Sequence, residues 1–200
     1  MGWFSPIKGH YPSLSQIDKT LPVKAGNTGI ERGMVIEVTG EAGTTNKDGE
    51  FKIAASATAE NASLLFISLQ DYQDAQAGMA GTTGFDGNVP AITEGNITIP
   101  AVAAGTPTIT GLALSMEGEY ETDQYTGLAN KPVGTPLTVT NGKFVEADTT
   151  GENPPVIVAY LTSGPYSRWV NNATAKPEGA PRGQVTRQGK NVTVIRFITK

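Results

Sequence analysis

The chain has 200 residues and no cysteine, and charged residues make up only 17% of it, against a usual share of about a quarter. The missing cysteines exclude a disulfide framework, a thiolate zinc site and a cysteine nucleophile. With 24 glycines and 13 prolines, the composition is typical of a turn-rich β protein. We therefore expect an all-β fold, with β-hairpins and meanders in a sandwich or barrel-like domain, an extended N-terminal arm and long Gly/Thr/Ala-rich loops.

Residues 1–30 are predicted to be an extended N-terminal arm, followed by a β-rich domain over residues 31–200. Three prolines in the first 22 residues favour extended backbone over a long helix. The arm carries the aromatic residues Trp3, Phe4 and Tyr11. Leaving their apolar surface in water costs about 25 cal/mol of free energy per Å². We expect these three side chains to dock on the body of the molecule or on a neighbouring subunit.

Residues 31–77 predict a first meander, with a hairpin of strands near 36–39 and 51–54 and a third strand at 64–67. A short helix is predicted at 68–78, with Ser68 as its N-cap and Gly78 as its stop. The tract 78–110 is predicted to be a long loop that joins this half to a second half at 111–200. Its glycines match neither of the common phosphate-binding loop patterns.

Residues 112–123 alternate between apolar and polar side chains, as in one continuous strand. Such a strand would place four acids on one face: Glu117, Glu119, Glu121 and Asp123. That face needs solvent, basic side chains from another chain, or a divalent cation, and the sequence leaves these three readings open. A pair of its carboxylates would also suit a glycosidase, although nothing else in the sequence indicates a substrate cleft.

The strongest local signal lies between Gly134 and Trp169. Two strand-like runs, 137–140 and 143–146, are separated only by Asn141-Gly142, the pair that best adopts a type I′ turn. In this hairpin Val139 faces Phe144 and Thr138 faces Val145. A third strand is predicted at 155–161, closed by the breakers at 163–165.

The hairpin at 137–146 has a counterpart earlier in the chain. Its spacing repeats at equivalent residues, listed here as pairs: Gly33 and Gly134, Ile36 and Leu137, Val38 and Val139, Thr39 and Thr140, Gly49 and Gly142, Phe51 and Phe144, Ala54 and Ala147. We interpret the repeat as an internal duplication. The alternative is that two hairpins with glycine turns resemble each other by chance.

The C-terminal end of the chain is basic and is predicted to close on a strand at 191–198, stitched into the sheet. From residue 168 onward there are seven basic residues and one acid, against eight basic and eighteen acidic residues before it. We expect Arg182, Arg187 and Lys190 to contact acidic surfaces of another subunit. Nucleic-acid binding is the other reading, but the segment lacks a dense Lys/Arg cluster with interleaved aromatics.

No catalytic constellation emerges from the sequence. There is one histidine, no nucleophile elbow and no phosphate-binding loop, so we expect a protein without catalytic residues, metal or cofactor. No apolar run approaches the roughly 18 residues of a membrane span. A structural or binding protein is therefore favoured over an enzyme.

The second half resembles the capsid decoration, or cement, proteins of tailed bacteriophages. The resemblance rests on 119–122, on the run 133–139 with Gly134, Pro136, Leu137 and Val139, on Asn141-Gly142-Lys143, and on the closing strand 194–197. It implies a virion protein made in the host cytoplasm, bound to the outer surface of an icosahedral head. Its implied partners are the major capsid protein and further copies of itself, as a trimer or dimer, with no nucleic acid and no membrane.

The alternative is a carbohydrate- or receptor-binding β module of a phage fibre or a similar surface structure. Four aromatic residues would supply a stacking platform for sugars: Tyr120, Tyr125, Tyr166 and Trp169. Core or interface packing is the competing explanation for these side chains. A carboxylate-dependent glycosidase is the third and weakest reading.

Overall fold

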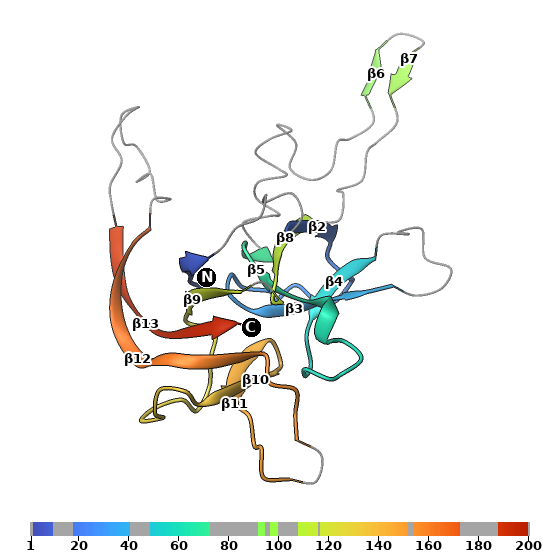
Figure 1. Cartoon of the computed structure of the whole chain (residues 1–200). Helices are drawn as coiled ribbons and strands as arrows, with labels where there is room; N and C mark the ends of the chain where they lie inside the picture. The colour runs from blue at the N-terminus through green and yellow to red at the C-terminus, as the bar shows by residue number, and fades with distance from the viewer. Residues whose placement is uncertain are drawn as a thin grey trace.

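The computed structural model describes residues 2–9, 18–40, 49–72, 92–94, 97–99, 108–115, 117–151, 154–172 and 188–199. The chain is all-β, as the sequence predicts. The described strands form a six-stranded sheet, a five-stranded sheet and a separate two-stranded hairpin (Figure 1).

The five-stranded sheet comes from the first part of the chain and has the spatial order β2-β8-β5-β3-β4. Its strands are β2 (Asp18–Pro22), β3 (Val35–Thr39), β4 (Glu50–Ile53), β5 (Leu65–Ser68) and β8 (Thr108–Ala113). A short 3-10 helix, η2 (Ala62–Leu64), leads into β5. The separate hairpin, β6 (Ile92–Glu94) and β7 (Ile97–Ile99), lies between β5 and β8 in the chain.

The six-stranded sheet has the order β1-β9-β13-β12-β10-β11. Its strands are β1 (Phe4–Gly9), β9 (Gly118–Thr122), β10 (Pro136–Thr140), β11 (Lys143–Glu146), β12 (Ala159–Asn172) and β13 (Gln188–Thr199). The terminal strand lies inside this sheet, between β9 and β12, so the predicted strand at 191–198 is confirmed.

Apart from β1, the second sheet repeats the first strand for strand. We call β2, β3, β4, β5 and β8 the first half and β9, β10, β11, β12 and β13 the second half; the two halves share the same spatial order. A parallel bridge joins the extension of the first strand to the third in each half, between Val23 and Phe51 and between Tyr125 and Phe144. Each half is therefore a curled sheet of one design.

Equivalent backbone hydrogen bonds also occur within each of the two halves. The N–H of Gly33 donates to the carbonyl of Ser68, and the N–H of Gly134 donates to the carbonyl of Leu161, both at 2.8 Å. Both glycines have positive φ, 85° and 90°, which glycine adopts without the steric cost of a Cβ. This agreement in strand order and in backbone hydrogen bonds is what an internal duplication predicts.

The hairpin of β10 and β11 has the predicted register. Val139 pairs with Phe144 and Thr138 pairs with Val145, while Asn141 and Gly142 have φ values of 48° and 75°, as a type I′ turn requires. The hairpin of β3 and β4 and its pairing with β5 are confirmed as well.

The tip of the second hairpin joins the two halves. Asn141 and Gly142 donate their N–H groups to the carbonyls of Ala55 and Ala54, at 2.9 and 2.7 Å. The carbonyl of Gly142 accepts a bond from the N–H of Val35 at 2.8 Å. The tip is thus paired with the backbone of the first half.

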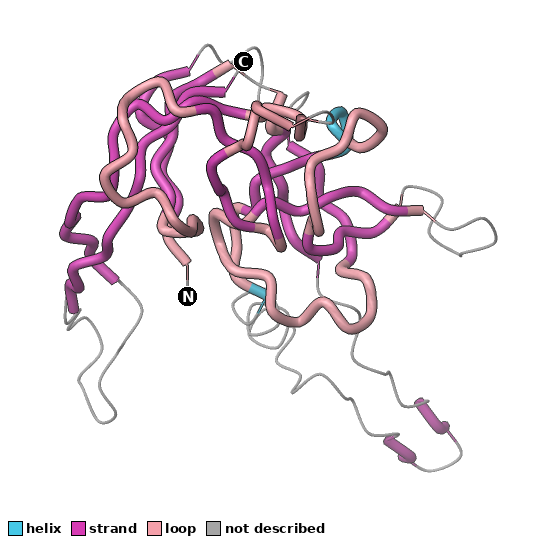
Figure 2. The backbone as a smooth tube through the Cα atoms, turned by 90° about the horizontal axis from the view of Figure 1, so that it is seen from below, coloured by secondary structure: helices cyan, strands magenta, loops and turns pink. Residues whose placement is uncertain are grey.

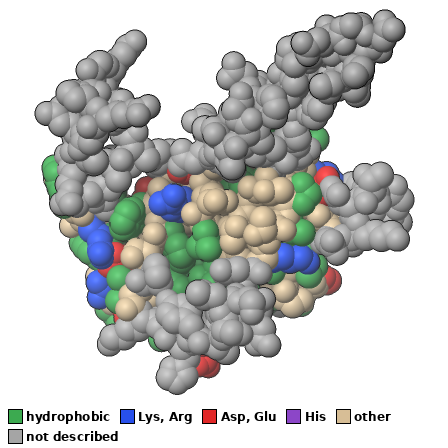
Figure 3. All heavy atoms as spheres, turned by 90° about the horizontal axis from the view of Figure 1, so that it is seen from above, with side chains coloured by type: hydrophobic (Ala, Val, Ile, Leu, Met, Phe, Trp, Pro, Cys, Tyr) green, Lys and Arg blue, Asp and Glu red, His purple; other side chains and the backbone are tan. Residues whose placement is uncertain are grey.

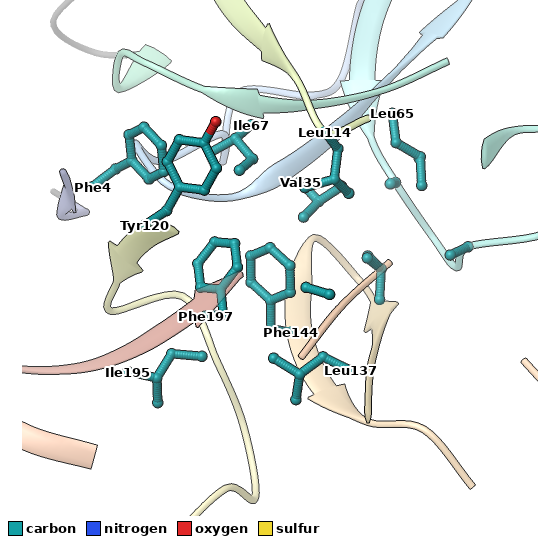
Figure 4. Close-up of a cluster of buried hydrophobic side chains, with 14 of the residues drawn as sticks. Phe4, Val35, Leu65, Ile67, Leu114, Tyr120, Leu137, Phe144, Ile195 and Phe197 are labelled. Carbon is teal, nitrogen blue, oxygen red and sulfur yellow. The ribbon is translucent and has the colours of Figure 1, made fainter. Parts of the chain in front are cut away.

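The main hydrophobic core lies between the halves. Figure 4 shows Val35, Ile67 and Leu114 of the first half facing Phe144 and Phe197 of the second. A smaller cluster fills the interior of the first half, made of Leu21, Val23, Ile30, Ile36, Phe51 and Ile109. Because the larger core draws on both sheets, the two halves stabilise each other.

The predicted N-terminal arm, 1–30, is part of both sheets, which corrects its assignment as a separate segment. β1 pairs with β9 and β2 pairs with β8. Phe4 is 8% exposed, and its ring stacks on that of Tyr120 at 5.5 Å between centroids. Pro6 and Pro22 lie in these two strands, so the backbone is extended there as predicted, but it pairs with neighbouring strands.

The single strand predicted for 112–123 is wrong. β8 ends at Ala113 in one sheet and β9 begins at Gly118 in the other. Leu114, in the turn between them, is buried in the shared core. The alternation of side chains continues through the turn although the backbone changes sheets, and so periodicity does not reveal the break.

Two other boundaries differ from prediction. β12 continues through 163–165 as far as Asn172, with register shifts against β13 at those residues. Among the described strands β10 pairs with β12 only at Ala159 and Tyr160, so Pro165 faces an edge without a partner strand there, where its missing N–H costs no ladder bond. Ser68 ends β5 rather than capping a helix, and residues 73–78 lie outside the described residues.

Candidate functional site

The functional candidates gather where β12 and β13 leave the body of the molecule. β12 pairs with β10 only up to Tyr160, and β13 pairs with β9 only from Ile195 onward. Outside those stretches, the two strands pair only with each other among the described strands. We call residues 163–172 and 188–194 the ribbon; it projects away from the packed strands (Figures 1 and 2). An isolated two-stranded ribbon is marginal in water, so its base needs anchoring.

The anchor is a buried carboxylate on β9. Glu121 is fully buried and accepts hydrogen bonds from the hydroxyl of Tyr166, from Nη1 of Arg168 and from Nη2 of Arg196, the last at 2.8 Å. Tyr166 and Arg168 belong to the ribbon, whereas Arg196 is the cross-strand partner of Glu121 on β13. The two basic side chains are about one-third exposed.

Strand geometry explains this arrangement. Successive side chains of β9 point to opposite faces, so Tyr120 enters the core while Glu121 lies on the opposite face with Arg196. The first half has Thr20 and Thr110 at the equivalent cross-strand position, joined by a 2.9 Å hydrogen bond between their hydroxyls. The second half therefore replaces a neutral pair with a charged one at the point where its ribbon starts.

The electrostatics of this cluster favour a structural role. The hydrogen bond to Glu121 is the main cause of a raised pKa at Arg196. Burial, followed by the hydrogen bond to Glu121, raises the pKa of Tyr166, which therefore remains a protonated donor. Nε of Arg196 also donates to Glu121, at 3.3 Å, so four hydrogen bonds occupy the roughly four acceptor sites of this carboxylate. Glu121 therefore serves as an anchor.

Apolar contacts complete the base of the ribbon. Val192 and Val194 are buried against the side chains of Trp3 and Tyr166. The guanidinium of Arg168 lies 5.9 Å from the ring centroid of Trp3, within cation–π range. The segment that precedes β1 thus packs against a strand pair from the other end of the chain.

Trp169 is the exposed aromatic residue of the ribbon. It pairs with Asn191, and alternation along the strand places it on the face opposite Tyr166 and Arg168. Its side chain is 62% exposed. An indole left in water is the most costly apolar exposure in the described part of the ribbon.

A second apolar surface lies at the seam between the halves. A groove of about 310 Å³ is lined by Leu114, Val156, Ile157 and Tyr160, together with residues of η2. In a different view, Figure 3 shows the face seen from above, where unlabelled hydrophobic side chains reach the surface in the middle, with Lys and Arg side chains nearby.

The acidic stripe has its partners within its own chain. Glu119 accepts a bond from the Thr162 hydroxyl at 3.0 Å and lies 4.0 Å from Arg196. Asp123 accepts the N–H of Trp3 at 2.7 Å, and burial is the main cause of its raised pKa. Only Glu117 is exposed. Glu119 and Glu121 thus have basic partners in the same chain rather than in another one, whereas Asp123 binds a backbone N–H and Glu117 is exposed.

Several predicted contact residues take other places. Phe4 and Glu121 are buried in the fold, which removes their side chains from the set of exposed contacts. The backbone of Lys190 lies in β13 opposite Val170, and Tyr11, Arg182 and Arg187 lie outside the described residues. Within the described ranges, no three acidic, histidine or cysteine side chains gather as metal ligands.

The predicted platform of four aromatic residues does not form. Tyr120 is buried in the core, Tyr125 packs against that core, and Tyr166 is hydrogen-bonded to Glu121. Trp169 remains exposed, on the other face of the ribbon from Tyr166. These tyrosines are therefore explained by packing and hydrogen bonding within the chain.

The sequence missed the grouping of Tyr166, Arg168 and Arg196 around Glu121. Their convergence depends on β9 pairing with β13, two strands more than sixty residues apart in the chain. The one sequence signal was the excess of basic residues that begins at Arg168, opposite an acidic remainder.

In comparisons with known proteins, no family model, no curated protein and no solved structure matches this chain. Of the helices in the described residues, none has the length and apolar character to cross a membrane.

Proposed function

We propose that this protein is a non-enzymatic structural component of a virion that binds the exterior of an icosahedral phage head and stabilises contacts between major-capsid subunits. The proposal starts from the resemblance of its second half to capsid decoration proteins. The elements that carry this resemblance, in β9, β10, β11 and β13, all belong to one sheet, so they form a connected unit.

The observation that carries the proposal is the anchored ribbon with Trp169 exposed on one face. A projecting strand pair with a fixed base can reach a neighbouring protein without losing the order of the body, which limits the entropic cost of binding. Exposed aromatic residues in such a position are typical interface anchors. We assign the ribbon to the capsid contact.

The charge of the ribbon suits an acidic capsid surface. The segment from residue 168 onward is basic, while the rest of the chain is acidic. Glu121 neutralises part of this charge at Arg168 and Arg196, so the remaining attraction comes from the residues beyond the ribbon base. We expect head binding to weaken as salt rises from about 0.05 to 1 M, because the Debye length falls from roughly 14 to 3 Å.

The test is binding to isolated heads that lack the protein. Purified protein is mixed with heads, the heads are sedimented, and the bound fraction is measured for the wild type, Trp169→Ala and the control Leu64→Ala. Leu64 is also an exposed apolar residue, 42% exposed, but lies in η2 of the first half. Saturable binding that Trp169→Ala weakens by tenfold or more, with Leu64→Ala unchanged, supports the proposal. Wild-type protein that stays in the supernatant at every salt concentration refutes it.

A further inference from the structure

The backbone nitrogen of Gly2, just before β1, lies against the buried carboxylate of Asp71, just after β5. The N–H of Gly2 donates to Oδ1 of Asp71 at 2.9 Å, and the N–H of Arg32 donates to the same oxygen at 2.9 Å. Asp71 is 5% exposed, and its second oxygen, Oδ2, is buried with no hydrogen-bond partner. A buried carboxylate oxygen without a partner is costly.

The neighbouring groups add negative charge. Asp123 binds the N–H of Trp3, the next residue, and Nε2 of Gln124 bridges Asp123 and Glu31 at 2.8 and 3.1 Å. Within the described residues, the hydrogen bonds to Asp71 come from two neutral backbone N–H groups, those of Gly2 and Arg32. A neutral peptide N–H at Gly2 therefore leaves this buried carboxylate without a positive partner.

Position 2 has room only for glycine. A Cβ built there would lie 2.1 Å from the carbonyl oxygen of Arg32 and 3.0 Å from Nε2 of Gln124. The backbone nitrogen is therefore held close to Asp71 by a contact that any side chain would prevent. Figure 1 shows the N-terminal end beside β9, where the two halves meet.

We propose that the Met1–Gly2 peptide bond is hydrolysed in the mature protein and that the resulting α-ammonium of Gly2 forms a buried ion pair with Asp71. In the cleavage, which a peptidase catalyses, one water is consumed: the Met1 carbonyl carbon gains the hydroxyl and becomes a carboxylate. The Gly2 nitrogen gains the protons and becomes an ammonium. The cut is defined by this bond, irrespective of how much chain precedes it.

The ion pair supplies what Asp71 lacks, which is a hydrogen-bond donor for Oδ2 and a positive charge beside the carboxylate. An ammonium has three N–H donors where the peptide has one, so it supplies donors for both oxygens of Asp71. Its positive charge balances a carboxylate that has left water. The pair also ties the start of β1, in the six-stranded sheet, to the end of β5, in the five-stranded sheet, and so cleavage locks the two halves together.

The first measurement is N-terminal sequencing with the intact mass of the purified protein. The proposal predicts a chain that begins Gly-Trp-Phe. A chain that begins at Met1, or before it, overturns the proposal.

The second measurement is the rate at which an amine-acylating reagent modifies the α-amino group at neutral pH. In the folded wild type the rate is expected to be at least tenfold below that of the urea-unfolded chain, and Asp71→Asn is expected to raise it. Asp148→Asn is the control, because Asp148 is an exposed carboxylate that bonds locally to Thr150. Should Asp71→Asn fail to fold, the folded-to-unfolded ratio of the wild type still decides.

Two results contradict the ion pair. Equal rates in folded and unfolded wild type would show an amine that is free in solvent. An unchanged rate in folded Asp71→Asn would show that the Asp71 carboxylate does not hold the amine.

Discussion

The N–H of Gly142, at the tip of one hairpin, donates a 2.7 Å hydrogen bond to the carbonyl of Ala54, at the end of the equivalent hairpin in the other half. A Cβ at Gly142 would lie 2.9 Å from Cγ2 of Ile53 and 3.2 Å from the Val35 carbonyl oxygen. The turn therefore serves both the hairpin and the junction between the halves.

We predict that Gly142→Ala destabilises the fold more than Gly134→Ala. Both glycines have positive φ, 75° and 90°, so both variants pay a backbone strain of about 1 kcal/mol. Only Gly142 has neighbours within 4 Å of the added Cβ, which we expect to add about 1 to 3 kcal/mol. Urea unfolding of the two variants measures the difference. Equal losses would mean that the tip does not dock as described.

The ion pairs of Glu121 give a second prediction. Glu121→Gln leaves Arg168 and Arg196 without their carboxylate and is expected to cost about 3 kcal/mol, at the low end for buried pairs because the two guanidiniums can recover some water. The control is Glu146→Gln, which breaks the exposed pair with Lys131 and is expected to cost less than about 1 kcal/mol. Chemical unfolding compares the two. A loss at Glu121 no larger than at Glu146 would remove its role as the anchor.

Phe4 provides a test of how the N-terminal segment is used. Because its ring is buried against Tyr120, Phe4→Ala is expected to cost about 3 to 5 kcal/mol of stability. Ile7→Ala, on the same strand but only partly buried, is the milder comparison. Unfolding curves decide: a Phe4→Ala protein with wild-type stability would restore the picture of an arm free to reach another subunit.

Asp123 predicts a pH dependence. Burial raises its pKa in the folded state, so the folded protein binds more protons than the unfolded chain from about pH 4, the ordinary Asp value, up to the raised pKa. The contribution of Asp123 to stability therefore falls as pH rises through this window. The Asp123→Asn variant has no titrating carboxyl at this position, but its side chain keeps an oxygen that can accept the N–H of Trp3. Relative to the wild type, the variant should gain stability as pH rises from about 4 through the raised pKa; a difference that stays constant as pH rises above about 4 would contradict the shift.

The sequence predicted local structure well because local rules govern it. Asn141-Gly142 determines a turn type and therefore the register of its two strands. The matched spacing of Gly33 with Gly134 and of Phe51 with Phe144 indicates a duplication from the sequence alone. These signals depend on residues close together in the chain.

The sequence did not predict which distant strands pair with each other. Nothing near Phe4 indicates that its strand pairs with β9, and nothing near Glu121 indicates that β13 brings Arg196 beside it. Pro165 is usually a strand breaker, and the chain tolerates it only because β12 has a free edge there. The candidate site depends on these non-local pairings, so the sequence supplied its charges without their partners.

The central claim, that the protein stabilises the outside of a phage head, is tested most directly by electron cryomicroscopy of heads incubated with the purified protein. We predict additional density on the outer surface, at junctions between major-capsid subunits, with the ribbon and Trp169 facing the shell. Heads whose outer surface is unchanged at saturating protein would contradict the claim.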